Sequence, residues 1–401
     1  MINMDTLLQE HILAIKDSYK HMIVQLHEWC GINSGTENLH GQQQMRNIIT
    51  QAFSPIADEI ITYQLPPITQ INMAGDTIMQ TYGDALYIRK RPCLKKRVLL
   101  SGHMDTVYTE NDAFQHLTYM TENILRGPGV ADMKGGLIIM LQALRNFEQL
   151  PCAKQLGWDV FINADEEIGS LASQHLFTEV APLCQTALVY EPAMPGGFLA
   201  KNRKGSGKFT LIAEGKAAHV GRAFHDGRNA ICYLAEAISA IHALNYQQDN
   251  VHINVGKIAG GSALNIVPDK AVAKLDVRIT NADDATWVHN KIDNIINKMQ
   301  CDGYKLTLHG NFHRPVKKIN QAHEHLFTRV QNIAKSLGIT LKWKDSGGCC
   351  DGNNLAMLGL PTLDTLGVCG GDIHTPNEFV LLDSLVERTA LSTLLLEELA
   401  S

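Results

Sequence analysis

Short apolar runs alternate with an amphipathic segment in the first half of the chain. Residues 97–100, 158–164 and 187–190 are runs of strand length, and residues 135–147 place their large apolar side chains on one helical face. Such alternation is typical of a largely parallel sheet covered by helices. After residue 315, a helical pattern at 321–337 and a strand-like run at 362–366 return to this style. The outer parts of the chain therefore predict an α/β domain with helices on both faces of the sheet.

The pattern between residues 205 and 315 is different. Strand-like segments at 208–213, 251–258, 271–280 and 304–309 are interrupted by helical patterns at 227–244 and 285–299. The order β-α-β-β-α-β is that of the split ferredoxin-like unit, in which two helices cover one side of a four-stranded sheet. We therefore expect residues 205–315 to form a ferredoxin-like α+β lid and dimerisation domain. It would be inserted into a catalytic domain made of residues 1–204 and 316–401.

Composition narrows the class of protein. A length of 401 residues fits two domains, and a formal charge of -6 gives no basic surface for nucleic acid. No apolar run is long enough to span a membrane, and the start of the chain lacks the features of a signal peptide. Nine scattered cysteines form neither a disulfide framework nor a thiolate zinc motif. We expect a cytoplasmic protein with neither nucleic acid nor membrane as a partner.

Polar residues follow the predicted strands at the point where each strand ends. In an open parallel sheet these ends share one edge, where ligands bind. Carboxylates gathered there would repel one another unless a cation neutralised them, and histidine with carboxylate is a suitable ligand set for zinc or a similar ion. The residues expected to converge at this edge are His103, Asp105, Asp132, Glu166, Glu167, Glu191 and His374.

Charge counting favours two ions over one. Three carboxylate ligands and a hydroxide balance the charge of about two divalent ions, as in the two-metal sites of aminopeptidases. In the acidic run after residue 164, neighbouring side chains point in different directions. Glu167 can therefore bind metal while Glu166 reaches the attacking water. Taken alone, each residue has a simpler explanation; Asp132, for example, fits a helix N-cap.

Nine motifs stand in the order found in one enzyme family. They are SGHMDTVY, GPGVADMKGG, NADEEIGS, YEPA, AAHVGRAFHDGRNA, ALNIVP, LDVR, SGGCCDGN and DIHTPNEF. Together they resemble the dinuclear zinc exopeptidases related to aminoacylase, acetylornithine deacetylase and succinyl-diaminopimelate desuccinylase. The match covers roughly residues 90–385, and Tyr108 after HMDTV is most similar to the glutamate carboxypeptidase (carboxypeptidase G-like) branch.

The resemblance implies a role for each polar residue at the sheet edge. His103 would bind one metal ion and His374 the other, Asp132 would bridge both, and Glu167 and Glu191 would complete one shell each. Asp105 would orient the His103 imidazole. Glu166 would act as general base, taking a proton from the metal-bridging water and passing it to the leaving amine. Zinc is the ion that the family implies, although cobalt or manganese could fill the same ligands.

The resemblance also assigns residues of the inserted domain and its surroundings. His219 would reach the neighbouring subunit's site in a homodimer and stabilise the oxyanion, with Asn265 close by. Arg314 would bind the free carboxylate of the substrate. Arg278 remains an alternative for that task, and His219 could instead be a polar residue at a strand end. Gly348 would offer its backbone to the substrate.

These roles predict a hydrolase that releases a C-terminal amino acid, glutamate being the first candidate, from a small peptide or N-acyl amino acid. An N-acyl amino acid deacylase or desuccinylase is the alternative, because only the acyl side differs. A catalytically inactive metal-binding homologue is a third possibility, which the intact Glu166 and ligand set argue against. Cys349 and Cys350 depart from the Gly-Thr or Gly-Ser usual in the family, which leaves the substrate open.

Overall fold

The computed structural model describes residues 15–401, and its central element is a six-stranded sheet in the order β1-β4-β8-β5-β9-β18. The strands are β1 (Glu59–Tyr63), β4 (Ala85–Lys90), β5 (Arg97–His103), β8 (Gly157–Asn163), β9 (Thr186–Val189) and β18 (Thr362–Leu363). Strands β8, β5, β9 and β18 are parallel, whereas β1 and β4 add an antiparallel edge. The sheet is thus mixed, and its parallel half carries the predicted polar residues.

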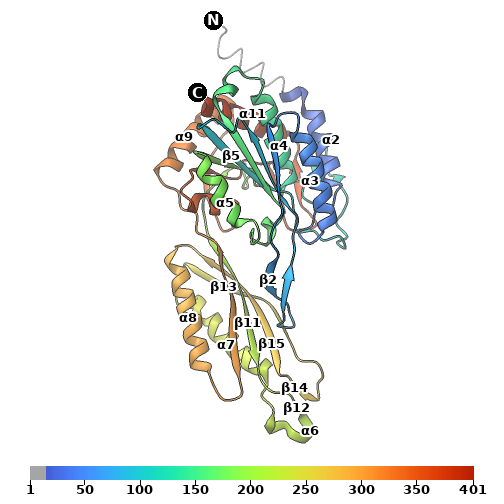
Figure 1. Cartoon of the computed structure of the whole chain (residues 1–401), viewed down its shortest axis with the longest axis vertical. Coiled ribbons are helices and arrows are strands. Elements are labelled where there is room, and N and C mark those ends of the chain that lie inside the picture. Colours follow the sequence, from blue (N-terminus) through green and yellow to red (C-terminus); the bar gives the residue numbers. More distant parts are fainter. Residues whose placement is uncertain (1–14) are drawn as a thin grey trace.

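Two apolar layers enclose this sheet (Figure 1). On one face, α2 (Tyr19–Cys30), α4 (Lys134–Phe147) and α11 (Asp383–Ala400) pack together over Leu100 and Val160. On the other face, Leu99 and Phe161 pack with α5 (Gln174–Val180) and α10 (Asp351–Met357). Successive strand residues point to opposite faces, so strands buried on both sides read as continuous apolar runs. This confirms the predicted α/β domain with helices on both faces.

A second sheet begins at Gly205 and ends at Arg314. Its strands β11 (Gly205–Glu214), β13 (Val251–Gly260), β15 (Lys270–Ile279) and β16 (Lys305–Arg314) are antiparallel in the order β13-β15-β11-β16. Helices α7 (Ala230–His242) and α8 (Asp283–Met299) pack on one face and share a separate apolar core with it. The predicted ferredoxin-like unit is therefore present, and in Figure 1 it extends below the first sheet. We call it the lid.

A hairpin from the first unit makes an additional contact with the lid, apart from the two chain connections. Strands β2 (Ile68–Ile71) and β3 (Thr77–Gln80) leave the catalytic domain and run alongside the lid (Figure 1). At the tip, Gly75 lies against Val272 on the lid face opposite the helices, and Asp76 pairs with Lys270 at 3.3 Å. The sequence analysis assigned no element before residue 97, so this hairpin and helices α2 and α3 are findings of the structure.

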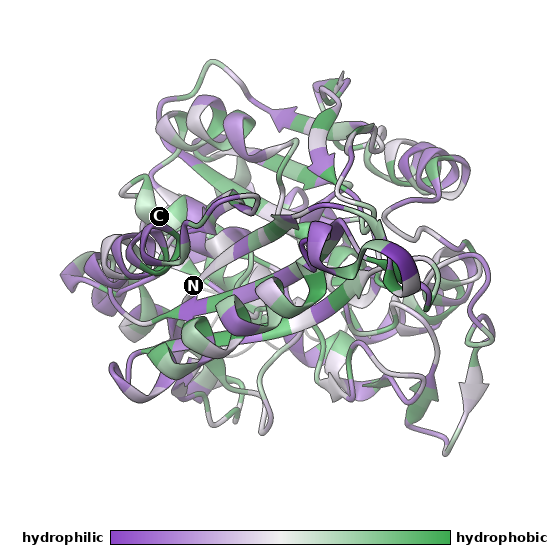
Figure 2. Ribbon diagram, turned by 90° about the horizontal axis from the view of Figure 1, so that it is seen from below, coloured by the Kyte–Doolittle hydropathy of each residue, from purple (hydrophilic) through white to green (hydrophobic). Residues whose placement is uncertain are grey.

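The remaining elements are short or peripheral. They are α3 (Leu39–Phe53), β6 (Thr118–Tyr119), β7 (Ile124–Arg126), β10 (Leu199–Arg203), β12 (Ala218–His219), α6 (Val220–Ala223), β14 (Ile266–Val267), α9 (Gln321–Ser336), β17 (Trp343–Ser346), β19 (Gly370–Gly371) and β20 (Phe379–Leu381), with short 3-10 turns between them. Figure 2 shows hydrophobic and hydrophilic residues alternating along many elements, as expected for amphipathic helices and half-buried strands. No helix within residues 15–401 is long and apolar enough to cross a membrane.

Candidate metal centre

The polar residues converge at the carboxyl ends of the parallel strands. His103 is the last residue of β5, Glu191 follows β9, and the acidic run Asp165–Glu167 follows β8. Asp132 precedes α4, whose first turn lies against the end of β9, because a side chain on Gly136 would meet the Tyr190 carbonyl at 2.0 Å. The topology thus brings together residues that are distant in sequence.

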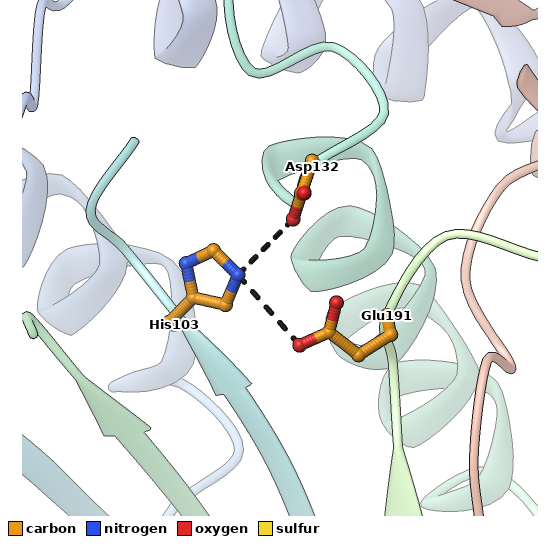
Figure 3. A group of neighbouring side chains, drawn as sticks. All are labelled: His103, Asp132 and Glu191. Carbon is orange, nitrogen blue, oxygen red and sulfur yellow. Dashed lines mark hydrogen bonds and ion pairs between the residues drawn. The ribbon is translucent and has the colours of Figure 1, made fainter. Parts of the chain in front are cut away.

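The first group of side chains consists of His103, Asp132 and Glu191, all buried (Figure 3). The imidazole Nε2 of His103 lies 3.2 Å from Asp132 Oδ1 and 3.8 Å from Glu191 Oε1. One ligand atom from each residue lies within 4.8 Å of the others, which suits a single ion among them.

The second group shares Asp132 with the first. His374 Nε2 lies 3.0 Å from Asp132 Oδ2 and 3.3 Å from Glu167 Oε2. The two oxygens of Asp132 therefore face the two histidines, one each, as a bridging carboxylate would. His374 has a left-handed backbone with φ of 62°, a conformation that costs free energy and is common at functional sites.

The side chains of these two groups are better suited to binding cations than to pairing with one another. Glu167 Oε1 is buried and has no hydrogen-bond partner within residues 15–401, an arrangement that proteins avoid unless another ligand is expected. Burial raises the pKa of Glu167 to about 8 and that of Glu191 well above its ordinary value, and the Asp132 charge adds to both shifts. Hydrogen bonds to Asp132 and Glu167 raise the pKa of His374 to about 11. Divalent cations bound among these groups would neutralise the charge that burial makes costly.

Asp105 connects the imidazole to the acidic turn. His103 Nδ1 lies 3.3 Å from Asp105 Oδ1 and 3.0 Å from the Asp105 carbonyl oxygen. The same carboxylate accepts the backbone N–H groups of Glu166 and Glu167, each at 3.2 Å, and the Thr36 hydroxyl at 2.9 Å. One buried side chain therefore contacts the His103 imidazole and also holds the turn that carries Glu166 and Glu167.

Glu166 lies beside the ligand groups and belongs to neither. Its side chain is largely buried, and Oε1 accepts a hydrogen bond from Arg314 Nη2 at 2.6 Å. Burial raises the pKa of Glu166 to about 7, while the positive charge of Arg314 opposes the shift. A carboxylate that titrates near neutral pH next to candidate metal ligands is suited to general acid–base chemistry.

Other predicted residues lie elsewhere. His219 and Asn265 are neighbours at the far end of the lid, where the Asn265 carbonyl accepts the Val220 N–H at 3.0 Å, and Figure 1 shows this end well away from β5. The Gly348 carbonyl accepts Arg203 Nη1 at 3.2 Å. The cysteines are unpaired, and the Cys349 thiol donates to the Lys204 carbonyl at 2.9 Å.

The sequence analysis missed Glu378, which is completely buried. Its carboxylate accepts the backbone N–H groups of Gly129, Ala131 and Asp132 at 3.1, 2.8 and 2.9 Å, and so fixes the loop that carries Asp132. It lies in the DIHTPNEF motif, four residues after His374, but the sequence analysis assigned it no role.

Comparison with known proteins agrees with this geometry. Residues 99–398 match peptidase family M20/M25/M40. Carboxypeptidase G2 of Pseudomonas sp. (strain RS-16) is 26% identical over 309 residues, covering 76% of this chain and 74% of the relative. The succinyl-diaminopimelate desuccinylase of Hahella chejuensis (strain KCTC 2396) is 26% identical over 323 residues, covering 75% and 82%.

Solved structures share the fold at lower identity. The dipeptidase Dug1p of Saccharomyces cerevisiae superimposes with a TM-score of 0.76 at 13% identity, covering 98% of both chains. A tripeptidase of Staphylococcus aureus gives 0.72 at 21% identity, covering 95% of this chain and 98% of the other. The fold and the paired ligand groups define a metal-dependent hydrolase. The chain belongs to peptidase family M20/M25/M40.

Proposed function

We propose that this enzyme hydrolyses an amide bond and releases the C-terminal amino acid of a small peptide or N-acyl amino acid. The observation that carries the proposal is the position of Asp132 between the two ligand groups, with the non-ligating Glu166 beside them. This combination supports a site for two divalent ions next to a general base. We propose zinc as the ion, while cobalt or manganese would suit the same ligands.

Each residue would then have a separate task. His103 and Glu191 would hold one ion, His374 and Glu167 the other, and Asp132 both, while Asp105 fixes the His103 ring. Bound ions supply a Lewis acid for the scissile carbonyl and lower the pKa of water toward about 7. Glu166 accepts a proton from the attacking water and donates it to the leaving amine nitrogen.

Basic side chains near Glu166 support a substrate with a free carboxylate. Lys208 and Arg278 lie on neighbouring strands β11 and β15 and extend from the lid face opposite its helices. Arg278 Nε donates to Asp276 Oδ1 at 2.6 Å, and Arg278 Nη1 contacts Cys349 Sγ at 3.2 Å. We propose that this cationic face and the Gly348 backbone receive the released amino acid, with glutamate as the first candidate. The desuccinylase relatives favour an N-acyl amino acid deacylase as the second candidate.

The position of His219 supports a role in a homodimer. Exposed apolar side chains surround it on the lid, with exposures of 56% for Phe224, 104% for Leu264 and 40% for Ile266. Such residues favour a protein interface at this end. We propose that the lid pairs with a second copy and that His219 and Asn265 serve the partner's site, stabilising the oxyanion. The unpaired cysteines favour a reducing compartment such as the cytoplasm.

Hydrolysis of a substrate panel tests the proposal. Purified protein loaded with zinc is assayed on N-acyl glutamates, dipeptides with C-terminal glutamate, N-succinyl amino acids and tripeptides. Glu166→Gln is expected to lose at least about 100-fold in kcat while keeping its metal, because a general base contributes about 10²–10⁴-fold. Glu179→Gln, on the exposed face of α5, is the matched control and should keep wild-type activity. Release of an N-terminal residue from tripeptides alone would contradict the carboxypeptidase assignment.

The proposal for His219 has its own test. Mixed dimers that pair a Glu166→Gln subunit with a His219→Ala subunit should regain about half of the activity of the wild-type dimer, because one of the two sites then has both residues. Mixtures that never exceed the sum of the two parents would contradict a contribution across the dimer.

A further inference from the structure

The lid holds the turn that carries Glu166 through three side chains. Lys208 Nζ donates to the Ile168 carbonyl at 3.0 Å, and Arg314 Nη2 reaches both Glu166 Oε1 at 2.6 Å and Ser170 Oγ at 2.9 Å. The His313 ring lies so close to Gly169 that a Cβ there would stand 2.2 Å from it. The turn at residues 166–170 is therefore held by strands β11 and β16, which belong to the lid.

A β-bulge directs the Arg314 side chain toward the turn at residues 166–170. Along β16, Arg314 pairs with Ser206 and Phe312 pairs with Gly207, so His313 is an extra residue opposite the β11 strand. Bulges bend a strand and redirect its side chains, and they are frequent beside active sites. Here the redirected side chain leaves the lid and becomes 2% exposed inside the catalytic domain.

Both terminal nitrogens of Arg314 are already paired with the catalytic domain. Besides Glu166 and Ser170, its Nη1 contacts Asp351 Oδ1, and Asp351 is itself held by Asn163 at 2.8 Å and by Ser170 at 2.6 Å. A substrate carboxylate that bound both terminal nitrogens of this guanidinium would displace Asp351 and Glu166. That exchange would leave a buried carboxylate unpaired, which is costly.

We propose that Arg314 is a positioning residue for Glu166. Because Arg314 stands at the end of β16, the position of Glu166 then depends on where the lid lies. This inference rests on the proposed function, since it assigns Glu166 as the base. It replaces the expected role of Arg314 as the carboxylate ligand and leaves that task to the Arg278 and Lys208 face, where the Arg278–Asp276 pair is partly exposed and therefore cheaper to separate than the buried pairs of Arg314. A base displaced by about 1 Å costs on the order of 100-fold in rate.

Steady-state kinetics separate the two roles of Arg314. Arg314→Gln should lower kcat about 100-fold while the inhibition constant of the free amino acid that wild type releases stays within about twofold. Arg314→Lys should recover part of kcat, because one ammonium can still reach Glu166. An inhibition constant raised tenfold or more, with kcat nearly unchanged, would overturn the inference in favour of a carboxylate ligand. Arg329→Gln, an exposed arginine paired with Glu398, is the control.

Amide hydrogen exchange tests the same inference without turnover. Exchange of the peptide that covers residues 164–171 should become faster in Arg314→Gln, with the rest of the catalytic sheet unchanged. His313→Ala provides a second variant, because it removes the ring that lies against Gly169 while Arg314 remains; it should also speed exchange and lower kcat. Unchanged exchange in both variants would refute the claim that the lid holds the turn at residues 166–170. Absence of any hydrolysis by wild type would refute the proposed function instead, and the exchange result would still decide this inference.

Discussion

Replacing Glu378 with glutamine should loosen the loop that carries Asp132. The carboxylate is completely buried, and two of its three backbone donors, Ala131 N and Asp132 N, bond to Oε1, while Gly129 N bonds to Oε2. The amide can keep the first two bonds through its oxygen. Its NH2 group would then face the Gly129 N–H, so two donors would meet.

The magnitude follows from these three bonds. Leaving the buried Gly129 N–H without an acceptor costs about 1–3 kcal/mol, and changing two charge-assisted bonds into neutral ones costs about 1 kcal/mol each. Burial raises the pKa of Glu378, so its charged form pays a desolvation cost that glutamine avoids. We expect a net loss of about 2–3 kcal/mol in the free energy of unfolding, together with weaker metal binding.

Urea unfolding of metal-free protein measures the first effect, and metal content after dialysis measures the second. Asn377→Asp changes the neighbouring exposed residue and serves as the control. A free energy of unfolding within about 0.5 kcal/mol of wild type, with full metal content, would refute the claim that Glu378 holds the Asp132 loop.

Three further predictions address metal, pH and packing. The pKa of His103 is raised well above its usual value and that of His374 to about 11, so zinc binding at pH 7 should release at least two protons. Calorimetry in buffers of different ionisation enthalpy measures this release. Binding without proton release would contradict the prediction. Burial and the charge of Lys317 lower the pKa of His323 to about 4, below the unfolded value of about 6.5. The unfolded state therefore binds the proton first, so the free energy of unfolding should fall as pH drops from about 6.5 toward 4. The fall should be less steep in His323→Gln. Urea midpoints that vary with pH in the same way in both proteins across this window would refute the prediction. Gly136→Ala places a Cβ 2.0 Å from a backbone carbonyl at the end of β9 and should displace Glu191, with lost metal as the readout; wild-type metal content would contradict this.

The chain pattern predicted the sheet and the gathering of polar residues at its edge because both depend on short-range signals. Apolar runs buried on both faces reveal parallel strands, and polar residues just after them reveal the functional edge. His103 and Glu191 follow β5 and β9 directly, so strand position alone brought them together. The β-α-β-β-α-β order likewise revealed the lid, because its helices and strands have separate periodicities.

Long-range contacts were beyond that reasoning. The hairpin tip touches the lid about 190 residues later in the sequence, where Asp76 pairs with Lys270, and no local pattern encodes that pairing. No local pattern indicates that the bulge at His313 buries Arg314 against Asp351 and Glu166. Glu378 was assigned no role from the sequence, and only the fold gives it three backbone donors.

Titration of metal-free protein with zinc tests the central claim most directly. The account predicts two ions per chain for wild type, one for Glu191→Ala, which keeps the Asp132, Glu167 and His374 group, and none bound tightly for Asp132→Ala, which both groups share. Binding of a single ion to wild type, or of two ions to Asp132→Ala, would contradict a bridged pair of metal sites at the end of the sheet.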